Sequence, residues 1–392
     1  MQSNCLICQS ENLEKIFKVS NIPLVPNAPL EPSDFESEIL VDLNIVQCQN
    51  CSLVYNRAFD PAMVEKIYTE NYSSGIPSSP KILEKYKFII EDVIGRESLK
   101  RQNIVEIGAS DFTFSELLLE KGANQVIAFE PSNLFRTENP RIYHIDSFFD
   151  VNQISINTNE IGLVVIRHVV EHLPDPLSTL REISELAPVG MKFYVEVPNV
   201  DDILLKNRFY DFFYEHVSYF SPNLLSGLMV SLGFKTLKVE HLVQGQHFGL
   251  LCEKVRPKEL NLNFSEFSEN LFSTSDFINY TQSFLEKIED VIQSYEKVAI
   301  YGAGNHGLGV ASLLNVNDNR IQCFLDLNKM KEGKFSPKTH IPIRVPEANI
   351  LDQLDAVVVI ASLHQDDIVV SLRDKFRFKG DIWATYPNIF KL

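Results

Sequence analysis

Short apolar strands that alternate with helices constrain the fold of this chain more than any other feature of its sequence. From Asn103 onward, the apolar run Ile104–Ile107 predicts a strand, and the segment Phe114–Lys121 predicts a helix. The alternation continues with strands at 125–129, 141–144, 163–166 and 192–197, helices at 177–186 and 224–232, and paired strands at 235–243 and 249–254. Elements of these lengths in this order predict an α/β fold with a parallel, doubly wound sheet.

The alternation restarts toward the C-terminus and indicates a second α/β unit. A strand at 298–301, a Gly-rich turn and a helix to about Leu314 are followed by strands at 322–325 and 356–361. Residues 1–60 are instead rich in turn formers and proline. A chain of 392 residues is too long for one ordinary core. We therefore predict three domains: a small module at 1–70, an α/β domain at 71–257 and a Rossmann-like α/β domain at 258–392.

The net charge, the first residues and the length of the apolar runs argue against several classes of protein. A formal net charge of -16 argues against a general nucleic-acid binder, because phosphate contacts need clustered Lys and Arg. The segment Met1–Cys5 lacks the basic and apolar stretches of a signal peptide. The longest apolar runs, 161–166 and 356–361, are far shorter than a membrane span. We expect a cytoplasmic protein that binds neither nucleic acid nor membrane, as a monomer or a homodimer.

Four of the six cysteines form two Cys-x-x-Cys pairs, Cys5 with Cys8 and Cys48 with Cys51. One such turn supplies two thiolates of a tetrahedral zinc site, so the two turns together complete a set of four ligands. In a reducing compartment this spacing indicates a metal site before a disulfide. No histidine lies nearby and no coordination position is left open, so the zinc is expected to be structural. The remaining two cysteines lie in apolar, strand-like segments and are expected to be inert.

A loop with the features of a nucleotide site follows the strand at 104–107. Gly108 allows the chain to turn tightly beneath a ligand, and Glu130 ends the next strand 22 residues later, within reach of ribose hydroxyls. Asp146 follows a third strand, where an adenine amino group is often bound. These intervals favour a class I methyltransferase-type sheet that binds S-adenosylmethionine. The expected donor-binding residues are Glu106, Gly108, Ser110, Asp111, Glu130, Asp146 and His168.

Further motifs accompany this loop along nearly the whole chain. They are His168–His172, Val195–Pro198, Glu215–Ser221 (Glu-His-Val-Ser-Tyr-Phe-Ser) and Lys331–Ile343, which ends in Thr-His-Ile-Pro-Ile. With the two cysteine pairs, they make the chain resemble the sugar C-methyltransferases that act on nucleotide-linked 4-ketosugars, which share this three-part layout. The resemblance implies S-adenosylmethionine as methyl donor and a nucleotide-linked sugar as acceptor.

Methylation of a carbon beside a ketone needs a base that removes an acidified C–H proton, and a group that holds the developing enolate. Histidine is the side chain whose ordinary pKa suits a base near neutral pH. We expect His216 to be this base, oriented by Glu215 or by a neighbouring backbone group. By resemblance, His172 polarises the carbonyl or holds the sugar. The expected catalytic set is His216, Glu215, His172, Tyr214 and Tyr72.

Several residues depart from the family pattern where a substrate should lie. Phe213-Tyr214 stand where the family has Tyr-His, Ser74 replaces the second Tyr of a Tyr-x-Tyr that begins at Tyr72, and Gly245–Gly249 replaces a Gly-Gly-Ser string. Phe112 stands where most such loops carry another glycine, which suggests a narrower or differently shaped pocket. Two alternatives therefore stay open: O- or N-methylation of a modified sugar, and a non-catalytic protein that binds S-adenosylmethionine and a nucleotide-sugar.

The Gly-rich turn near the C-terminus, Gly302–Gly307, is a literal G-x-G-x-x-G after a strand, with Asp326 24 residues after Gly302. This is the fingerprint of a dinucleotide site. The sugar methyltransferases place a similar turn in a domain that helps to hold the nucleotide-sugar. Nucleotide-sugar binding is favoured, while NAD(P) binding, with hydride transfer, and a scaffold without ligand stay open. The expected substrate-binding residues are Tyr301, Gly302, Gly304, His306, Asp326, Lys334 and His340.

Overall fold

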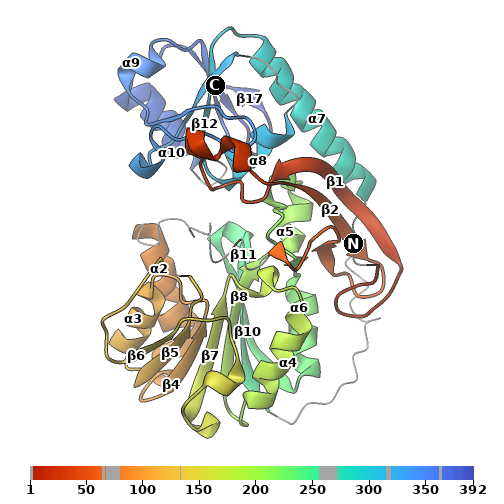
Figure 1. The fold of residues 1–392 in the computed structure, drawn as a ribbon, viewed down its shortest axis with the longest axis vertical. Coiled ribbons are helices and arrows are strands. Elements are labelled where there is room, and N and C mark those ends of the chain that lie inside the picture. Colours follow the sequence, from red (N-terminus) through yellow and green to blue (C-terminus); the bar gives the residue numbers. More distant parts are fainter. Residues whose placement is uncertain are drawn as a thin grey trace. The chain divides into compact units, whose positions relative to one another are not determined.

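The computed structural model describes residues 3–63, 67, 80–132, 134–255, 272, 274–314, 319–361 and 364–392 (Figure 1). The chain divides into two compact units. The first consists of Met1–Glu14, Val46–Ile203 and Glu215–Phe272, and the second of Lys15–Ile45, Leu204–Tyr214 and Ser273–Leu392. Within the described ranges, no helix is both long and apolar enough to cross a lipid bilayer.

The first unit is built on a seven-stranded sheet. Its strands are β4 (Asn103–Ile107), β5 (Gln125–Phe129), β6 (Ile142–Ile145), β7 (Ile161–Arg167), β8 (Lys192–Pro198), β10 (Phe234–Leu242) and β11 (His247–Lys254). Their order is β10-β11-β8-β7-β4-β5-β6. Strands β4 to β8 are parallel, whereas β11 is antiparallel to both of its neighbours, β8 and β10. The predicted doubly wound sheet is confirmed. The chain leaves β4 toward β6 and returns to β7, so the carboxyl ends of β4 and β7 meet at a topological switch point.

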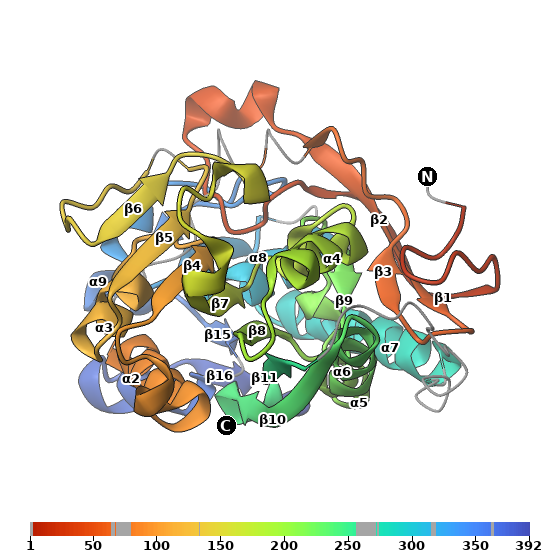
Figure 2. The same cartoon turned by 90° about the horizontal axis from the view of Figure 1, so that it is seen from below.

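Helices cover both faces of this sheet (Figure 2). Alternate residues of each central strand point to opposite faces, and because both faces are covered, the strands are largely apolar, with Glu106, Arg167 and Glu196 among the charged exceptions. One face packs against α4 (Pro176–Leu186) and α6 (Pro222–Ser231), and the other against α3 (Thr113–Glu120) and the helical turns at 89–94. Both α4 and α6 begin with a capping side chain followed by proline, a common start for a helix. The remaining helices of the first unit's segments are α2 (Pro80–Phe88) and α5 (Val200–Leu205).

A smaller, four-stranded sheet lies in the N-terminal part of the chain. Its strands are β1 (Leu13–Pro23), β2 (Leu40–Cys48), β3 (Val54–Asn56) and β9 (Ser218–Tyr219), in the order β1-β2-β3-β9. The sequence analysis did not predict these strands, because turn formers and prolines dominate residues 1–60. One cysteine pair precedes β1, and the other lies at the turn between β2 and β3. The sheet therefore carries both cysteine turns.

The second unit contains a six-stranded sheet of order β14-β13-β12-β15-β16-β17. All its strand pairs are parallel except the last. The second parallel sheet predicted from the sequence is thus confirmed. The strands are β12 (Val298–Tyr301), β13 (Ile321–Leu325), β14 (Ile343–Arg344), β15 (Ala356–Val359), β16 (Asp381–Ala384) and β17 (Phe390–Lys391). The helices are α7 (Thr274–Gln293), α8 (Asn305–Leu313), α9 (Ala348–Leu351) and α10 (Gln365–Val370).

Candidate active site

A cavity of about 430 Å³ lies at the carboxyl ends of β4, β5 and β7 in the first unit. This is the switch point of the sheet, where open α/β sheets bind their ligands. Its wall is largely apolar, with a few polar groups, as is usual for small-molecule sites. The polar and charged residues that line it include Ser110, Asp111, Glu130, Arg167, His168 and His172.

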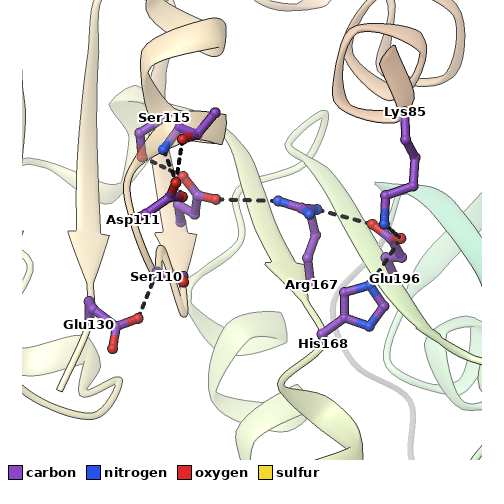
Figure 3. A network of polar contacts seen from close by, with 10 residues as sticks. Lys85, Ser110, Asp111, Ser115, Glu130, Arg167, His168 and Glu196 are labelled. Atoms are coloured by element: carbon purple, nitrogen blue, oxygen red, sulfur yellow. Dashed lines mark hydrogen bonds and ion pairs between the residues drawn. The ribbon is translucent and has the colours of Figure 1, made fainter. Parts of the chain in front are cut away.

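The turn after β4 requires glycine at one position. Gly108 has a φ of +76°, and a Cβ atom there would lie 2.3 Å from Cγ2 of Val169. The turn is then fixed by Glu130, whose Oε2 accepts a hydrogen bond from the backbone N–H of Ser110 at 2.7 Å (Figure 3). Oε1 of Glu130 accepts a second backbone bond, from Ser132, at 2.9 Å. The carboxylate is therefore held at the cavity wall in one orientation.

Phe112 does not narrow this cavity. Its backbone adopts the left-handed conformation, with a φ of +62°, that a glycine would adopt at the same place. Its ring is buried in the core on the helix α3 side and packs edge-on against His144, with ring centroids 4.9 Å apart. Because Phe112 is not among the residues that line the cavity, its ring does not narrow the pocket directly.

Two of the expected donor-binding residues lie outside the cavity lining. Glu106 is buried in β4, accepts a hydrogen bond from the Ser115 hydroxyl, and has its pKa raised to about 7 by burial. Asp146 is exposed and forms an ion pair with Arg136 at 3.1 Å. The expected residues that do line the cavity are Gly108, Ser110, Asp111, Glu130 and His168.

A buried network of charges stands behind one wall of the cavity (Figure 3). Its centre is Glu196 on β8, which has no exposed surface. Oε1 of Glu196 lies 2.9 Å from Nζ of Lys85 and 3.1 Å from Nε2 of His168, and Oε2 lies 3.0 Å from Nε of Arg167. Burial favours protonation of this carboxyl, but His168, Lys85 and Arg167 hold its pKa well below the ordinary value. Sequence analysis included Glu196 in the motif Val195–Pro198 but assigned it no role.

The predicted catalytic histidines lie side by side. The rings of His172 and His216 are 4.6 Å apart and nearly perpendicular. Nδ1 of His172 lies 3.0 Å from the backbone oxygen of Glu215, so Glu215 orients His172 through its backbone. Burial lowers the pKa of both histidines below 6.5 and raises that of the Glu215 carboxyl to about 8. His172 lines the cavity, whereas His216 is its partly exposed neighbour.

Of the two tyrosines expected in the catalytic set, the structure describes only Tyr214. Tyr72, with Ser74 beside it, lies outside the described residues. Tyr214 directly precedes Glu215 and is buried, but it does not line the cavity and belongs to the second unit. Among the described residues of the predicted set, the geometry therefore supports the two histidines more directly than Tyr214.

The four paired cysteines converge. Sγ of Cys5 lies 3.5 Å from Sγ of Cys51, and Sγ of Cys8 lies 3.4 Å from Sγ of Cys48. All four sulfur atoms lie within 4.8 Å of one another, and none is in a disulfide. Four thiols brought together from two turns match the donor set of a closed, tetrahedral zinc site.

The Gly-rich turn of the second unit repeats the arrangement found after β4. Gly302 has a φ of +117°, and a Cβ there would lie 2.7 Å from the backbone oxygen of Ile360. Oδ2 of Asp326 accepts a hydrogen bond from the backbone N–H of Ala303 at 3.1 Å. Lys331 donates to the backbone oxygen of Ala303 at 2.6 Å. Asp326 and the turn are thus held together by direct contacts.

The other expected substrate-binding residues make contacts of their own. Tyr301 is buried at the end of β12, and Gly304 caps α8. Nε2 of His306 lies 2.5 Å from Oδ1 of Asp211. Lys334 and His340 lie against the segment 31–38 rather than the turn. Nζ of Lys334 is 3.9 Å from Glu31, and Nε2 of His340 is 3.0 Å from Glu38.

Comparisons with known proteins agree with this geometry. Residues 82–239 match the family model of a methyltransferase domain, and residues 252–387 match that of the C-methyltransferase C-terminal domain. The C-methyltransferase NovU of Streptomyces niveus is 26% identical over 406 residues, which cover 98% of this chain and 95% of that protein.

Solved methyltransferase structures are similar to part of the chain. Magnesium protoporphyrin IX methyltransferase from Synechocystis, with bound S-adenosylhomocysteine, is 12% identical, with a TM-score of 0.35 over 44% of this chain and 86% of that one. An S-adenosylmethionine-dependent methyltransferase from Aquifex aeolicus is 17% identical, with a TM-score of 0.34 over 50% of this chain and 100% of that one. The sheet and the matched methyltransferase domain show that the chain is an S-adenosylmethionine-dependent methyltransferase, and its C-terminal part is similar to the C-terminal domain of the C-methyltransferases.

Proposed function

We propose that this enzyme transfers a methyl group from S-adenosylmethionine to a carbon atom beside the ketone of a nucleotide-linked sugar. The observation that carries the proposal is the position of His172, which lines the same cavity as Gly108 and Glu130 and packs against a second, partly exposed histidine, His216. The match to the C-methyltransferase C-terminal domain and the similarity to NovU support carbon as the methylated atom.

Residues of the turn after β4 and the end of β5 would hold the methyl donor. Gly108 lets the backbone pass close beneath it, and Glu130 offers carboxylate lone pairs to ribose hydroxyls. Ser110 and Asp111 complete this side of the cavity. S-adenosylmethionine, when bound there, supplies an electrophilic methyl group.

The histidines would handle the acceptor. His216 has its pKa lowered well below 6.5, so it is neutral near pH 7 and able to accept the C–H proton. Nδ1 of His172 lies 3.0 Å from the backbone oxygen of Glu215, and this contact fixes the orientation of the ring at the cavity wall. That fixed orientation suits a group that holds the ketone oxygen.

The flanking parts of the chain would stabilise and supply this site. The cysteine cluster at Cys5, Cys8, Cys48 and Cys51 would hold a structural zinc ion, because its four thiolates leave no open coordination position. The Gly-rich turn of the C-terminal domain, at Gly302 with Asp326, would bind the nucleotide part of the acceptor. These roles give the N-terminal, central and C-terminal domains separate tasks.

The test is methyl transfer and proton exchange on a panel of nucleoside diphosphate-linked 4-ketosugars. We expect one sugar to gain a methyl group, and its acidic C–H to exchange with deuterated water when S-adenosylhomocysteine replaces the donor. His216→Asn should lower both rates by about 10²–10⁴-fold. His241→Asn, which changes an exposed histidine on β10, is the control. Methylation without exchange would instead indicate an oxygen or nitrogen acceptor, and donor binding without turnover on any sugar would indicate a binding protein.

A further inference from the structure

His168 lines the cavity at the switch point of the sheet. It is the first residue after β7, next to β4, where Ile107 pairs with Ile166 and Gly108 follows. Its side chain lines the cavity and is 31% exposed. The sequence analysis placed His168 among the donor-binding residues without a specific contact.

Glu196 holds His168 at two points. The backbone oxygen of Glu196 accepts the His168 N–H at 2.9 Å, and its carboxylate lies 3.1 Å from Nε2 of the ring. His168 adopts a φ of +52°, a left-handed conformation that is uncommon for a residue other than glycine. Such conformations persist where the surroundings enforce them and gather at functional sites. The ring is therefore locked in place before any ligand binds.

Both ring nitrogens of His168 face carboxylates. Nε2 faces Glu196, and Nδ1 lies 3.4 Å from Oε1 of Glu171. A neutral imidazole has one N–H, so one of its nitrogens would present a lone pair to a carboxylate. Only the imidazolium form satisfies both contacts. Among the described residues, neither oxygen of Glu171 accepts a hydrogen bond, so the Nδ1 contact is a longer ion pair of 3.4 Å, and the same N–H can also donate to a ligand in the cavity.

The surrounding charges favour the cation at His168 and neutral rings at its neighbours. Burial opposes the charge, but Glu196 and Glu171 raise the pKa of His168 above its ordinary value, while Lys85 acts in the opposite direction. The positive charge at His168 in turn helps to lower the pKa of His172 and His216. A third histidine, His247, lies with its ring 4.8 Å from His168. Arg167 contacts the same Glu196 carboxylate as His168 does.

We propose that His168 is a further catalytic residue of the methyl transfer, and that its Nδ1–H holds the oxyanion formed on the acceptor. The proposal rests on the proposed function. The base takes the C–H proton, the electron pair of that bond forms the C=C bond of the enolate, and the C=O π pair moves to the oxygen, which the imidazolium then stabilises. When the carbon takes the methyl group, the S–C electron pair stays on sulfur and the carbonyl reforms. His168 keeps its own proton throughout, so the base is the group that must later release one to solvent.

A fixed, buried cation is suited to this task because it needs no reorganisation as the charge develops. Glu196, Lys85 and Arg167 form the support of that cation, and Arg167 is itself held between the rings of Tyr86 and Phe114, 4.1 and 4.2 Å from its guanidinium carbon. The residues of the network are thus positioning residues. His168 and Arg167 both line the cavity, and His168, 31% exposed against 8% for Arg167, is the member that would border the acceptor.

The first experiment compares wild type with His168→Asn, using His241→Asn as the control. Calorimetry gives the affinity for S-adenosylhomocysteine, and deuterium exchange is measured on nucleoside diphosphate-linked 4-ketosugars with saturating S-adenosylhomocysteine. We expect exchange to fall by about 10²–10³-fold, the usual effect of losing an oxyanion-holding group, while the affinity for S-adenosylhomocysteine is retained. Unchanged exchange at saturation, with or without weaker binding, would overturn the proposal; weaker binding would make His168 a ligand of the donor.

A second experiment needs neither an acceptor nor a folded variant. Nuclear magnetic resonance of the full-length wild type with ¹⁵N-labelled histidine reports which ring nitrogens carry protons. At pH 7 we expect one buried histidine, assigned to His168, to carry protons on both nitrogens, while His172 and His216 carry one each. A neutral His168 would overturn the proposal even if the enzyme methylates a sugar. A protonated His168 in a chain that neither exchanges nor methylates any sugar would instead count against the proposed function.

Discussion

The backbone N–H of Ser110 donates a 2.7 Å hydrogen bond to the carboxylate of Glu130, so the acidic residue that ends β5 fixes the glycine turn that follows β4. The second unit repeats this relationship, since Ala303 donates to Asp326 at 3.1 Å. In both sheets the acidic residue therefore shapes the turn, and under the proposed function it would also offer lone pairs to a ligand. A substitution in either turn should disturb the ligand before it disturbs the fold.

Gly108→Ala should weaken binding of S-adenosylhomocysteine by about tenfold or more, because the turn must shift to remove a 2.3 Å contact between the new Cβ and Val169. Gly190→Ala is the matched control. Gly190 also has a positive φ, of +91°, but a Cβ there meets nothing within 4 Å. Calorimetry on both variants separates the clash from the cost of the backbone conformation. Equal affinities in the two variants would contradict the assigned role of Gly108.

The local parts of this arrangement were predictable from the sequence. Gly108 and Glu130 are separated by one strand–helix–strand unit, so their spacing alone brings them together. Asp146 follows the next strand in the same pattern, yet its carboxylate lies in solvent beside Arg136, because the pattern fixes the strand end but not the direction of the side chain. Periodicity thus predicted the sheet and most of the cavity residues that follow β4 and β5.

The long-range parts were not predictable. Lys85 and Glu196 are 111 residues apart and meet only because α2 packs near β8, a contact that no local pattern encodes. The strands β1 and β2 were missed because proline and turn formers conceal their alternation. Segments 15–45 and 204–214 join the C-terminal unit through contacts between residues that are far apart in the sequence. Such contacts depend on the packing of the whole chain.

Cys48→Ser should remove the zinc and lower the melting temperature, because one of four converging thiolates is lost. Metal analysis of the purified wild type should give about one zinc per chain. Cys252→Ser, a change at a buried cysteine outside the cluster, is the control and should keep its metal. A wild-type protein that is free of metal and unchanged in stability by a chelator would show that the four thiols have no structural ion.

Glu106→Gln should make the stability of the protein less dependent on pH. Burial raises the pKa of Glu106 from 4.5 to about 7, so between these values the folded chain holds a proton that the unfolded chain releases. Stability from this group is full below pH 4.5 and falls as pH rises to 7, by about 3 kcal/mol. Glutamine stays neutral and can still bond Ser115. Melting temperatures at pH 5 and pH 8 should therefore differ less in this variant than in Glu120→Gln, at an exposed site.

Asp326→Ala should weaken the binding of a nucleoside diphosphate to the full-length chain by about tenfold, the effect of losing one good contact. The carboxylate holds the Ala303 N–H and would also face the ribose, so both the turn and the ligand lose a partner. Asp352→Ala, an exposed aspartate after α9, is the control. Calorimetry with uridine and thymidine diphosphates measures the effect. Equal affinities for the two variants would show that Asp326 and its turn do not bind the nucleotide.

The pH dependence of kcat/KM should be bell-shaped, because the base must be neutral while His168 must be charged. The pKa of His216 is lowered below 6.5, so activity should rise with pH on an acid limb that lies below 6.5. The pKa of His168 is raised above 6.5, so activity should fall on an alkaline limb above that value, as the imidazolium loses its proton. His168→Asn should keep the acid limb and lose the alkaline one, at a lower maximal rate. A variant that retains both limbs would show that the alkaline limb belongs to another group, and that His168 does not act as the cation.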